Sequence, residues 1–222
     1  MNILTEIIKQ VDEFNLINNE NFAIDSIRAE FSKEYKLDQL KRLGNWNKIN
    51  KNDQKIYEKL AKRKLTKSEI SSAYKLENYN IYYYNKSDKQ KRKYRKAEMV
   101  IFGLKQYHKP PPPKELVFEI MRILKNVSNI DLCCDDNQAP NINNLKRYYQ
   151  LTPHFTTHYI NNTNIDMIEK ITIYDKQNKN NLDFQVWRYE AKVIIPNPKY
   201  LMIPFADFQE IINYGRAKND NY

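Results

Sequence analysis

The sequence predicts an α+β domain in which helices pack on one face of a largely antiparallel sheet. Two neighbouring segments, residues 170–176 and 186–193, indicate this most clearly, because both alternate apolar and polar residues with period two. The polar segment between them, Gln177 to Gln185, is typical of a hairpin loop. Stretches with helical spacing separate the other expected strands, which completes the pattern.

The remaining elements follow in chain order from the spacing of apolar residues. In the first half they are a helix over 3–16, a strand over Asn21 to Phe31, a mostly helical or irregular stretch over 33–73, and strands over Tyr79 to Tyr84 and Glu98 to Tyr107. In the second half they are a helix over 114–125 after four prolines, a strand over Asn129 to Asp136, a short basic helix over Asn141 to Gln150, and a terminal helix over Asp207 to Tyr214. We expect an N-terminal helix in 1–20, one main domain in 21–195, and a C-terminal helix and tail in 196–222.

The charge balance favours an anionic partner. The 222 residues include 37 Lys and Arg against 27 Asp and Glu, which gives a formal net charge of +10. Such a balance most often indicates a nucleic acid. The alternative is a solvated cationic surface encoded by an AT-rich genome, whose codons favour Lys, Asn, Ile and Tyr.

Cysteine usage and hydropathy predict a soluble, cytoplasmic protein without a membrane partner. The two cysteines, Cys133 and Cys134, are adjacent and therefore poorly placed to form a structural disulfide. No apolar run approaches the ~18 residues that a membrane span needs. Glu6 and Asp12 lie within the N-terminal amphipathic pattern, which is unlike a signal peptide.

A basic segment between two expected strands is a candidate for contact with a DNA backbone. Its high density of cations predicts a flexible hairpin tip or arm. The alternative is a solvated loop that does not contact DNA. Its cations are Lys86, Lys89, Lys91, Arg92, Lys93, Arg95 and Lys96.

Tyr174 is the best candidate for a nucleophile. It shares a strand face with Lys176, and the next strand places Arg188 on the same face as Glu190. A phenol has a pKa near 10, so a metal or these cations must stabilise the phenolate and a pentacoordinate phosphate. Tyr189 is the alternative nucleophile, although its place on the apolar face of its strand is explained more simply by packing.

Carboxylates on the expected sheet predict a metal site. Asp131 and Asp135 lie on one face of their strand but ~13 Å apart, so they cannot both bind one ion. One of them, together with Glu190 on a neighbouring strand, could hold Mg²⁺ or Mn²⁺, which favour carboxylate oxygens. For Asp135 a simple acidic strand end is the alternative, whereas Asp131 lies within an apolar strand, where burial is costly.

Three segments, taken in order, resemble the replication initiation factor family. They are Asn129-Ile130-Asp131-Leu132 with Asp135, Ile171 to Lys176, and Trp187-Arg188-Tyr189-Glu190. That family includes rolling-circle plasmid initiators of the staphylococcal type, and filamentous-phage replication initiators carry a similar pattern. The resemblance covers about residues 98–195. Asn129 stands where the family usually has Arg, and the chain is shorter than most members.

The resemblance implies a rolling-circle DNA replication initiator that nicks and joins one strand through a 5′-phosphotyrosine. It makes Tyr174 the nucleophile and makes Lys176 and Arg188 phosphate contacts. Asp131 and Glu190, with Asp135, would be ligands of Mg²⁺ or Mn²⁺. The implied partners are DNA at an origin hairpin or single-stranded region, a second copy of the chain, and a host helicase.

Two other functions fit the sequence. The first is a DNA-binding replication regulator that keeps the fold and forms no covalent product. The second is an RNA-binding protein that stacks bases on exposed tyrosines such as Tyr82 and Tyr84 and is indifferent to divalent metal.

Overall fold

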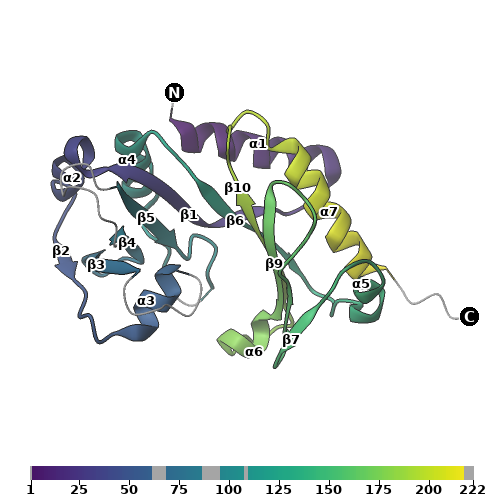
Figure 1. The fold of residues 1–222 in the computed structure, drawn as a ribbon. Helices are drawn as coiled ribbons and strands as arrows, with labels where there is room; N and C mark the ends of the chain where they lie inside the picture. Colours follow the sequence, from purple (N-terminus) through teal and green to yellow (C-terminus); the bar gives the residue numbers. More distant parts are fainter. Residues whose placement is uncertain (1, 62–68, 87–95, 108–109, 218–222) are drawn as a thin grey trace, which may run out of the picture. The chain divides into compact units, whose positions relative to one another are not determined.

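The computed structural model describes residues 2–61, 69–86, 96–107 and 110–217 (Figure 1). These residues form two compact units. The first consists of residues 1–4 and 26–128, and the second of residues 5–25 and 129–222. Each unit contributes five strands, whose neighbours within the unit are antiparallel, so the predicted α+β class with a largely antiparallel sheet is confirmed.

The sheet of the first unit has the strand order β2-β3-β4-β5-β1. Its strands are β1 (Ala23–Ser32), β2 (Trp46–Lys48), β3 (Ile70–Leu76), β4 (Ile81–Lys86) and β5 (Lys96–Phe102). Its helices are α2 (Lys33–Lys41), α3 (Gln54–Ala61) and α4 (Lys114–Leu124). Strand β1 begins among residues of the second unit, to which Asp25 belongs.

Both faces of this sheet are buried. On one face, Tyr57 and Leu60 of α3 pack into a cluster with Tyr82, Tyr84 and Val100, among others. On the opposite face, apolar side chains of β1 and β5 are also almost fully buried, including Ile27, Ala29, Met99 and Ile101. The two tyrosines that were candidates for base stacking in an RNA-binding protein therefore lie in a hydrophobic core.

The sheet of the second unit has the strand order β6-β10-β9-β8-β7. Its strands are β6 (Asn129–Asp136), β7 (Thr152–His154), β8 (Thr157–Ile160), β9 (Ile168–Asp175) and β10 (Trp187–Ile194). Its helices are α1 (Ile3–Asn18), α5 (Ile142–Tyr148), α6 (Lys176–Asn180) and α7 (Met202–Arg216).

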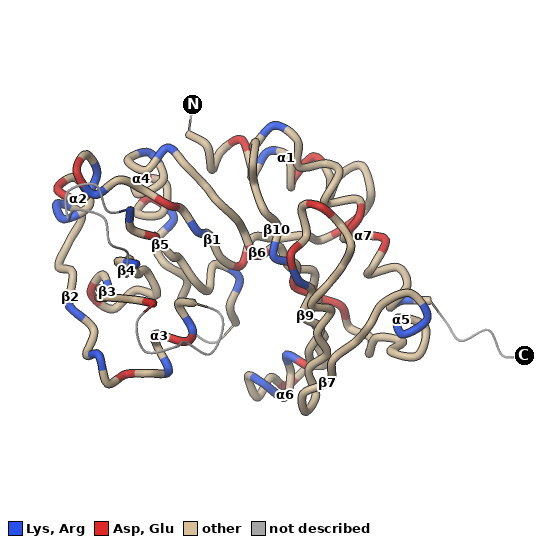
Figure 2. The backbone as a smooth tube through the Cα atoms, in the orientation of Figure 1, with Lys and Arg blue, Asp and Glu red and all other residues tan. Residues whose placement is uncertain are grey.

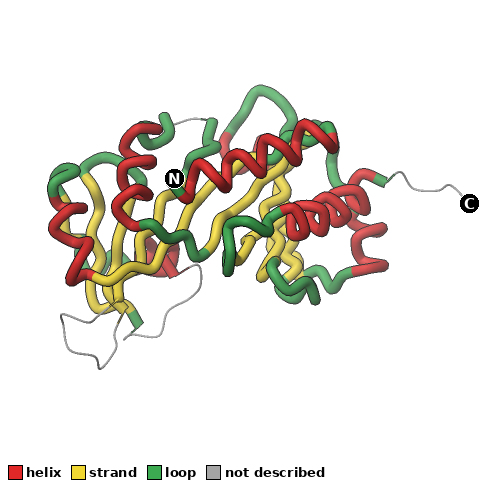
Figure 3. The backbone as a smooth tube through the Cα atoms, turned by 90° about the horizontal axis from the view of Figure 1, so that it is seen from above, coloured by secondary structure: helices red, strands yellow, loops and turns green. Residues whose placement is uncertain are grey.

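Helices α1 and α7 lie next to one another over the strands of the second unit (Figures 1 and 3). Aromatic rings join them: Phe14 of α1 contacts Phe22 and Phe205, with ring centroids 5.2 and 5.8 Å apart, respectively. Phe22 also contacts Phe208 of α7 at 5.2 Å. One face of this sheet is thus covered by helices, as predicted.

The two units share one strand order. In each, the first strand in sequence lies beside the fifth, followed by the fourth, third and second. Strands β4 and β9 therefore correspond, and each carries a tyrosine, Tyr84 or Tyr174, that is followed two residues later by a lysine.

Several sequence expectations agree closely with these elements, and one is wrong. The strand over Asn129 to Asp136 has the predicted bounds, and helices occupy the predicted positions at α1, α4 and α7. The segment Gln177 to Gln185 is not a simple hairpin loop, because it contains most of α6. Asp175 caps this helix by accepting a hydrogen bond from the backbone N–H of Asn178. In the described part of the chain, no helix is both long and apolar enough to cross a bilayer.

Candidate active site

One face of the second unit's sheet carries the polar residues of the candidate site. The strand register places Arg188 of β10 directly opposite both Asp135 of β6 and Tyr174 of β9. Glu190 lies one row further along the same face, opposite Cys133 and Thr172. Period-two alternation thus brings the predicted nucleophile and the predicted carboxylate together, as the sequence pattern indicated.

Tyr174 donates a hydrogen bond to Glu190. Its hydroxyl lies 3.4 Å from Oε2 of Glu190, a long hydrogen bond between diagonal neighbours on β9 and β10. Only 7% of Tyr174 is exposed. Burial, and then the charge of Glu190, raises the pKa of the Tyr174 phenol well above its ordinary value of about 10. The phenol is therefore neutral at pH 7, and its proton must be removed at the moment it reacts.

Arg188 is held between two carboxylates. Its Nε and Nη2 donate to the two oxygens of Asp135, both at 2.6 Å, and its Nη1 donates to Asp25 at 3.0 Å. Burial alone would lower the pKa of Arg188, but the hydrogen bonds and charge of Asp135 outweigh burial and raise it. The predicted phosphate-binding arginine is instead 1% exposed and organises the carboxylates.

Lys176 begins α6 beside this cluster, where Figure 2 marks basic residues. Its side chain is almost fully buried. Burial, followed by the positive charge of Arg188, lowers the pKa of its ammonium group to about 8, although the charges of Asp135 and Asp25 act in the opposite direction. A lysine with such a pKa can exchange a proton near neutral pH.

The three predicted metal ligands share one face of the sheet. Asp131 is buried on the face that also carries Asp135 and Glu190. Arg188 occupies the carboxylate oxygens of Asp135, and Glu190 accepts from Tyr174. Among the described residues, no group of three or more His, Cys, Asp or Glu side chains could hold a metal ion. A divalent ion would therefore have to displace Arg188 or Tyr174 from these carboxylate oxygens.

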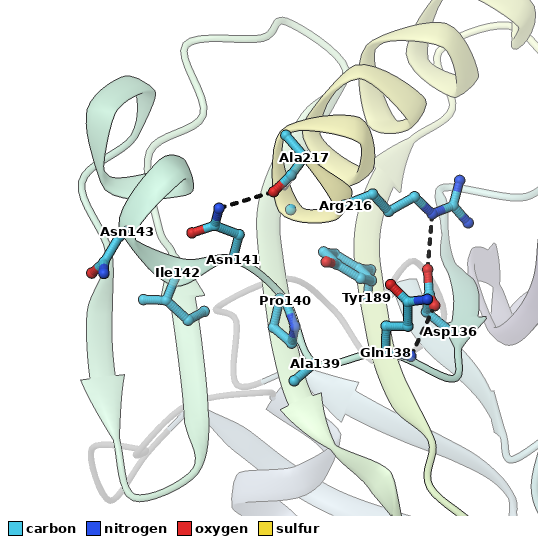
Figure 4. Close-up of a pocket in the computed structure, with 11 residues that line it drawn as sticks. Asp136, Gln138, Ala139, Pro140, Asn141, Ile142, Asn143, Tyr189, Arg216 and Ala217 are labelled. Atoms are coloured by element: carbon cyan, nitrogen blue, oxygen red, sulfur yellow. Dashed lines mark hydrogen bonds and ion pairs between the residues drawn. The ribbon is translucent and has the colours of Figure 1, made fainter. Parts of the chain in front are cut away.

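Tyr189, the alternative nucleophile, lies on the opposite face of β10. Its ring lies against α7, where a Cβ atom on Gly215 would come within 2.2 Å of its hydroxyl oxygen. Figure 4 shows this ring in the wall of a pocket, below Arg216, which is hydrogen-bonded to Asp136 at 2.8 Å. Tyr189 is 1% exposed, so its surroundings are those of a packed core residue.

Only the two ends of the predicted basic arm lie in the described part of the chain. Lys86 approaches Glu98 at 3.1 Å and Glu30 at 3.6 Å, and Lys96 approaches Glu30 at 2.6 Å. The other predicted contacts lie outside the described residues: Lys89, Lys91, Arg92, Lys93 and Arg95.

The tyrosine on the corresponding strand of the first unit, Tyr84, has different surroundings. Tyr84 lies directly opposite Glu98 of β5, and burial followed by the charge of Glu98 raises its pKa. Burial would raise the pKa of Glu98, but the charges of Arg28 and Lys86 lower it overall. A carboxylate bound by two cations is a poor proton acceptor, so this tyrosine has no effective base.

Asp25 is the site residue that sequence reasoning placed on a strand but did not assign to the site. The signal available was an aspartate within a largely apolar strand, the same signal that marked Asp131. Its partner Arg188 is 163 positions away in sequence, so only the fold brings the two together.

Comparison with known proteins yields little. No family model matches the sequence, and no curated protein matches it. Among solved structures, the chain is similar to the rolling-circle replication initiator protein from Geobacillus stearothermophilus, with 12% identity and a TM-score of 0.39. The similarity covers 84% of this chain and 79% of the other. A likeness this weak carries no argument about function.

Proposed function

We propose that this chain is a DNA-nicking enzyme that initiates rolling-circle replication, with Tyr174 as its nucleophile. The observation that carries the proposal is the hydrogen bond from the Tyr174 hydroxyl to Glu190, within a buried cluster that also holds Lys176. A nucleophile in contact with a base is the arrangement that covalent catalysis needs. The net charge of +10 and the ordered motifs that resemble replication initiators support DNA as the substrate.

The proposed step is a transesterification at one phosphodiester of a single strand. The Tyr174 oxygen attacks phosphorus while its proton passes to Glu190, and the bond from phosphorus to the 3′-oxygen breaks. The phosphate remains on Tyr174 as a 5′-phosphotyrosine, and Lys176 gives a proton to the leaving 3′-oxygen. The lowered pKa of Lys176, about 8, suits this transfer near neutral pH.

No step of the proposed reaction runs through the predicted Mg²⁺ or Mn²⁺, and the capture assay tests for dependence on the metal. Magnesium or manganese would stabilise charge on the transferring phosphate if the carboxylates released Arg188. Glu190, together with either Asp131 or Asp135, would then supply the protein ligands. Dependence on Mg²⁺ or Mn²⁺ thus stays a prediction, as do the second copy of the chain and the host helicase.

A second candidate function is a DNA-binding replication regulator without nicking activity. The burial and raised pKa of Tyr174 favour it, because a neutral, covered phenol is a poor nucleophile. This candidate predicts salt-sensitive DNA binding that is unchanged in Tyr174→Phe.

A covalent-capture assay separates the two. The full chain is incubated with single-stranded and supercoiled DNA of its own replicon, with Mg²⁺, Mn²⁺ or a chelator, and then run on denaturing gels. We expect a protein–DNA adduct that Tyr174→Phe abolishes. Tyr84→Phe is the matched control and should leave the adduct intact, because Tyr84 is a buried tyrosine on the corresponding strand of the first unit.

The remaining outcomes of the assay also have a meaning. An adduct that survives Tyr174→Phe keeps the nicking activity but contradicts the nucleophile, and Tyr189→Phe is then tested. Tight, salt-sensitive binding without any adduct supports the regulator.

A further inference from the structure

The polar face of the second unit's sheet extends from the candidate site to its outer edge. The row that contains Tyr174 continues through Thr157 of β8 to His154 of β7. The next row runs from Glu190 through Thr172 and Tyr159 to Thr152. Exposure increases along the first row, from buried Tyr174 through half-buried Thr157 to exposed His154, and the second row also ends at an exposed residue, Thr152.

Two lysines lie over two tyrosine rings on this face. Nζ of Lys179 is 4.0 Å from the ring centroid of Tyr174, and Nζ of Lys170 is 4.2 Å from that of Tyr159. The two tyrosines are diagonal neighbours on β9 and β8, because Tyr174 pairs with Thr157 and Tyr159 pairs with Thr172. Two cations are thus held beside the candidate nucleophile by cation–π contacts.

An exposed aromatic residue stands at the end of the same rows. Phe155 joins β7 to β8, is 92% exposed, and has a left-handed backbone with φ of 52°. Its ring contacts that of His154, with centroids 4.7 Å apart. A phenylalanine in this conformation is uncommon, and its exposed ring contributes little to any core. Tyr174 and His154 are two strand spacings apart, ~10 Å, which a short stretch of single strand can bridge.

We propose that the face formed by β7, β8 and β9 binds the single-stranded DNA that flanks the scissile bond. Lys170 and Lys179 contact its phosphates, and Phe155 stacks on a base at the hairpin tip. This proposal rests on the proposed nicking function, because only a nicking enzyme has a scissile bond. The cations and an open aromatic ring fit a polyanion with exposed bases, whereas a duplex hides its bases from the ring.

Fluorescence anisotropy of a labelled thymidine oligonucleotide tests the surface with the full chain and needs no nicking. We expect Phe155→Ala to weaken binding about 5- to 100-fold and Phe155→Trp to restore it, because stacking tolerates any aromatic ring. Lys170→Gln should reduce the slope of log affinity against log salt by about 0.7, the share of one phosphate contact on a single strand. Tyr200→Ala removes another exposed ring, 64% exposed, and should bind like the wild type.

These results test the proposed DNA-binding surface independently of the nicking reaction. Wild-type affinity in both Phe155→Ala and Lys170→Gln would overturn the proposal, as would equal affinity for a duplex of the same length. If covalent capture gives no adduct while Phe155→Ala still weakens binding, the nicking proposal fails and the DNA surface stands. If an adduct forms at Tyr174 while Phe155→Ala binds normally, only the surface proposal fails.

Discussion

Tyr84 and Tyr174 lie on corresponding strands of two units with the same strand order, and they differ in the residue that stands directly opposite them. Directly opposite Tyr84 is Glu98, which is bound by Arg28 and Lys86. Directly opposite Tyr174 is Arg188, which is engaged by Asp25 and Asp135 and leaves Glu190 to accept from the phenol. The residue opposite the tyrosine is thus a glutamate in the first unit and an arginine in the second. This difference distinguishes Tyr84, a structural residue, from Tyr174, the proposed nucleophile.

Replacing the base should slow the reaction and change its pH dependence. In Glu190→Gln, we expect adduct formation to fall about 10²- to 10⁴-fold at pH 7. Because the pKa of Tyr174 is raised, its phenolate stays scarce, and the variant's rate should then rise about tenfold per pH unit. Single-turnover adduct formation from pH 6 to 10 measures both effects. A variant that reacts at the wild-type rate would remove Glu190 from the step.

The buried ammonium group of Lys176 should cost stability near neutral pH. We expect Lys176→Met to be more stable than the wild type by about 3 kcal/mol at pH 7, from a folded-state pKa of about 8 against an unfolded value of about 10.4. Between pH 8 and pH 10.4, about the two pKa values, the unfolded chain binds one proton more than the folded chain. The wild type therefore gains stability as the pH rises, and the advantage of Lys176→Met shrinks. Urea denaturation at pH 7 and 9.5 tests this. An advantage that does not change with pH would contradict it.

Removing the guanidinium of Arg188 should destabilise the second unit. In Arg188→Met, the carboxylates of Asp25 and Asp135 lose their shared partner, at a cost of about 3 kcal/mol. Arg122→Gln breaks an exposed ion pair with Glu119 and is the control, for which we expect no measurable shift. The urea midpoints of the two variants give the comparison, and equal midpoints would show that the buried pair contributes nothing specific.

Packing around Tyr189 should be sensitive to a single methyl group. In Gly215→Ala, the new Cβ would lie 2.2 Å from the Tyr189 hydroxyl oxygen, so we expect a loss of about 1–3 kcal/mol. Tyr189→Phe should relieve part of that loss in the double variant and should still form the DNA adduct. Thermal unfolding of the two single variants and the double variant measures the coupling. Additive losses would mean that the two side chains do not meet.

Periodicity in the sequence identified the parts of the site that lie on long strands. The alternation in residues 170–176 and 186–193 predicted correctly which side of β9 and β10 carries Tyr174, Arg188 and Glu190. It also separated Tyr189 from that face. These inferences hold because side-chain direction in a strand depends only on local geometry.

The rest depended on long-range contacts that no local pattern contains. Short strands such as β2 and β7 have too few residues to show a period, and α6 has only five. The family resemblance assigned Arg188 to a phosphate, and no local pattern indicated that Asp25 and Asp135 would surround its guanidinium. Strand order determines such pairs, and it becomes visible only in the folded chain.

The most direct measurement is to locate the DNA on the protein. The covalent product is digested with nuclease and protease, and mass spectrometry identifies the residue that carries the remaining nucleotide. The account predicts a nucleotide linked through its 5′-phosphate to Tyr174, with none on Tyr84 or Tyr189. A nucleotide on a different residue, or a purified chain that binds its DNA and never becomes linked to it, would contradict the account.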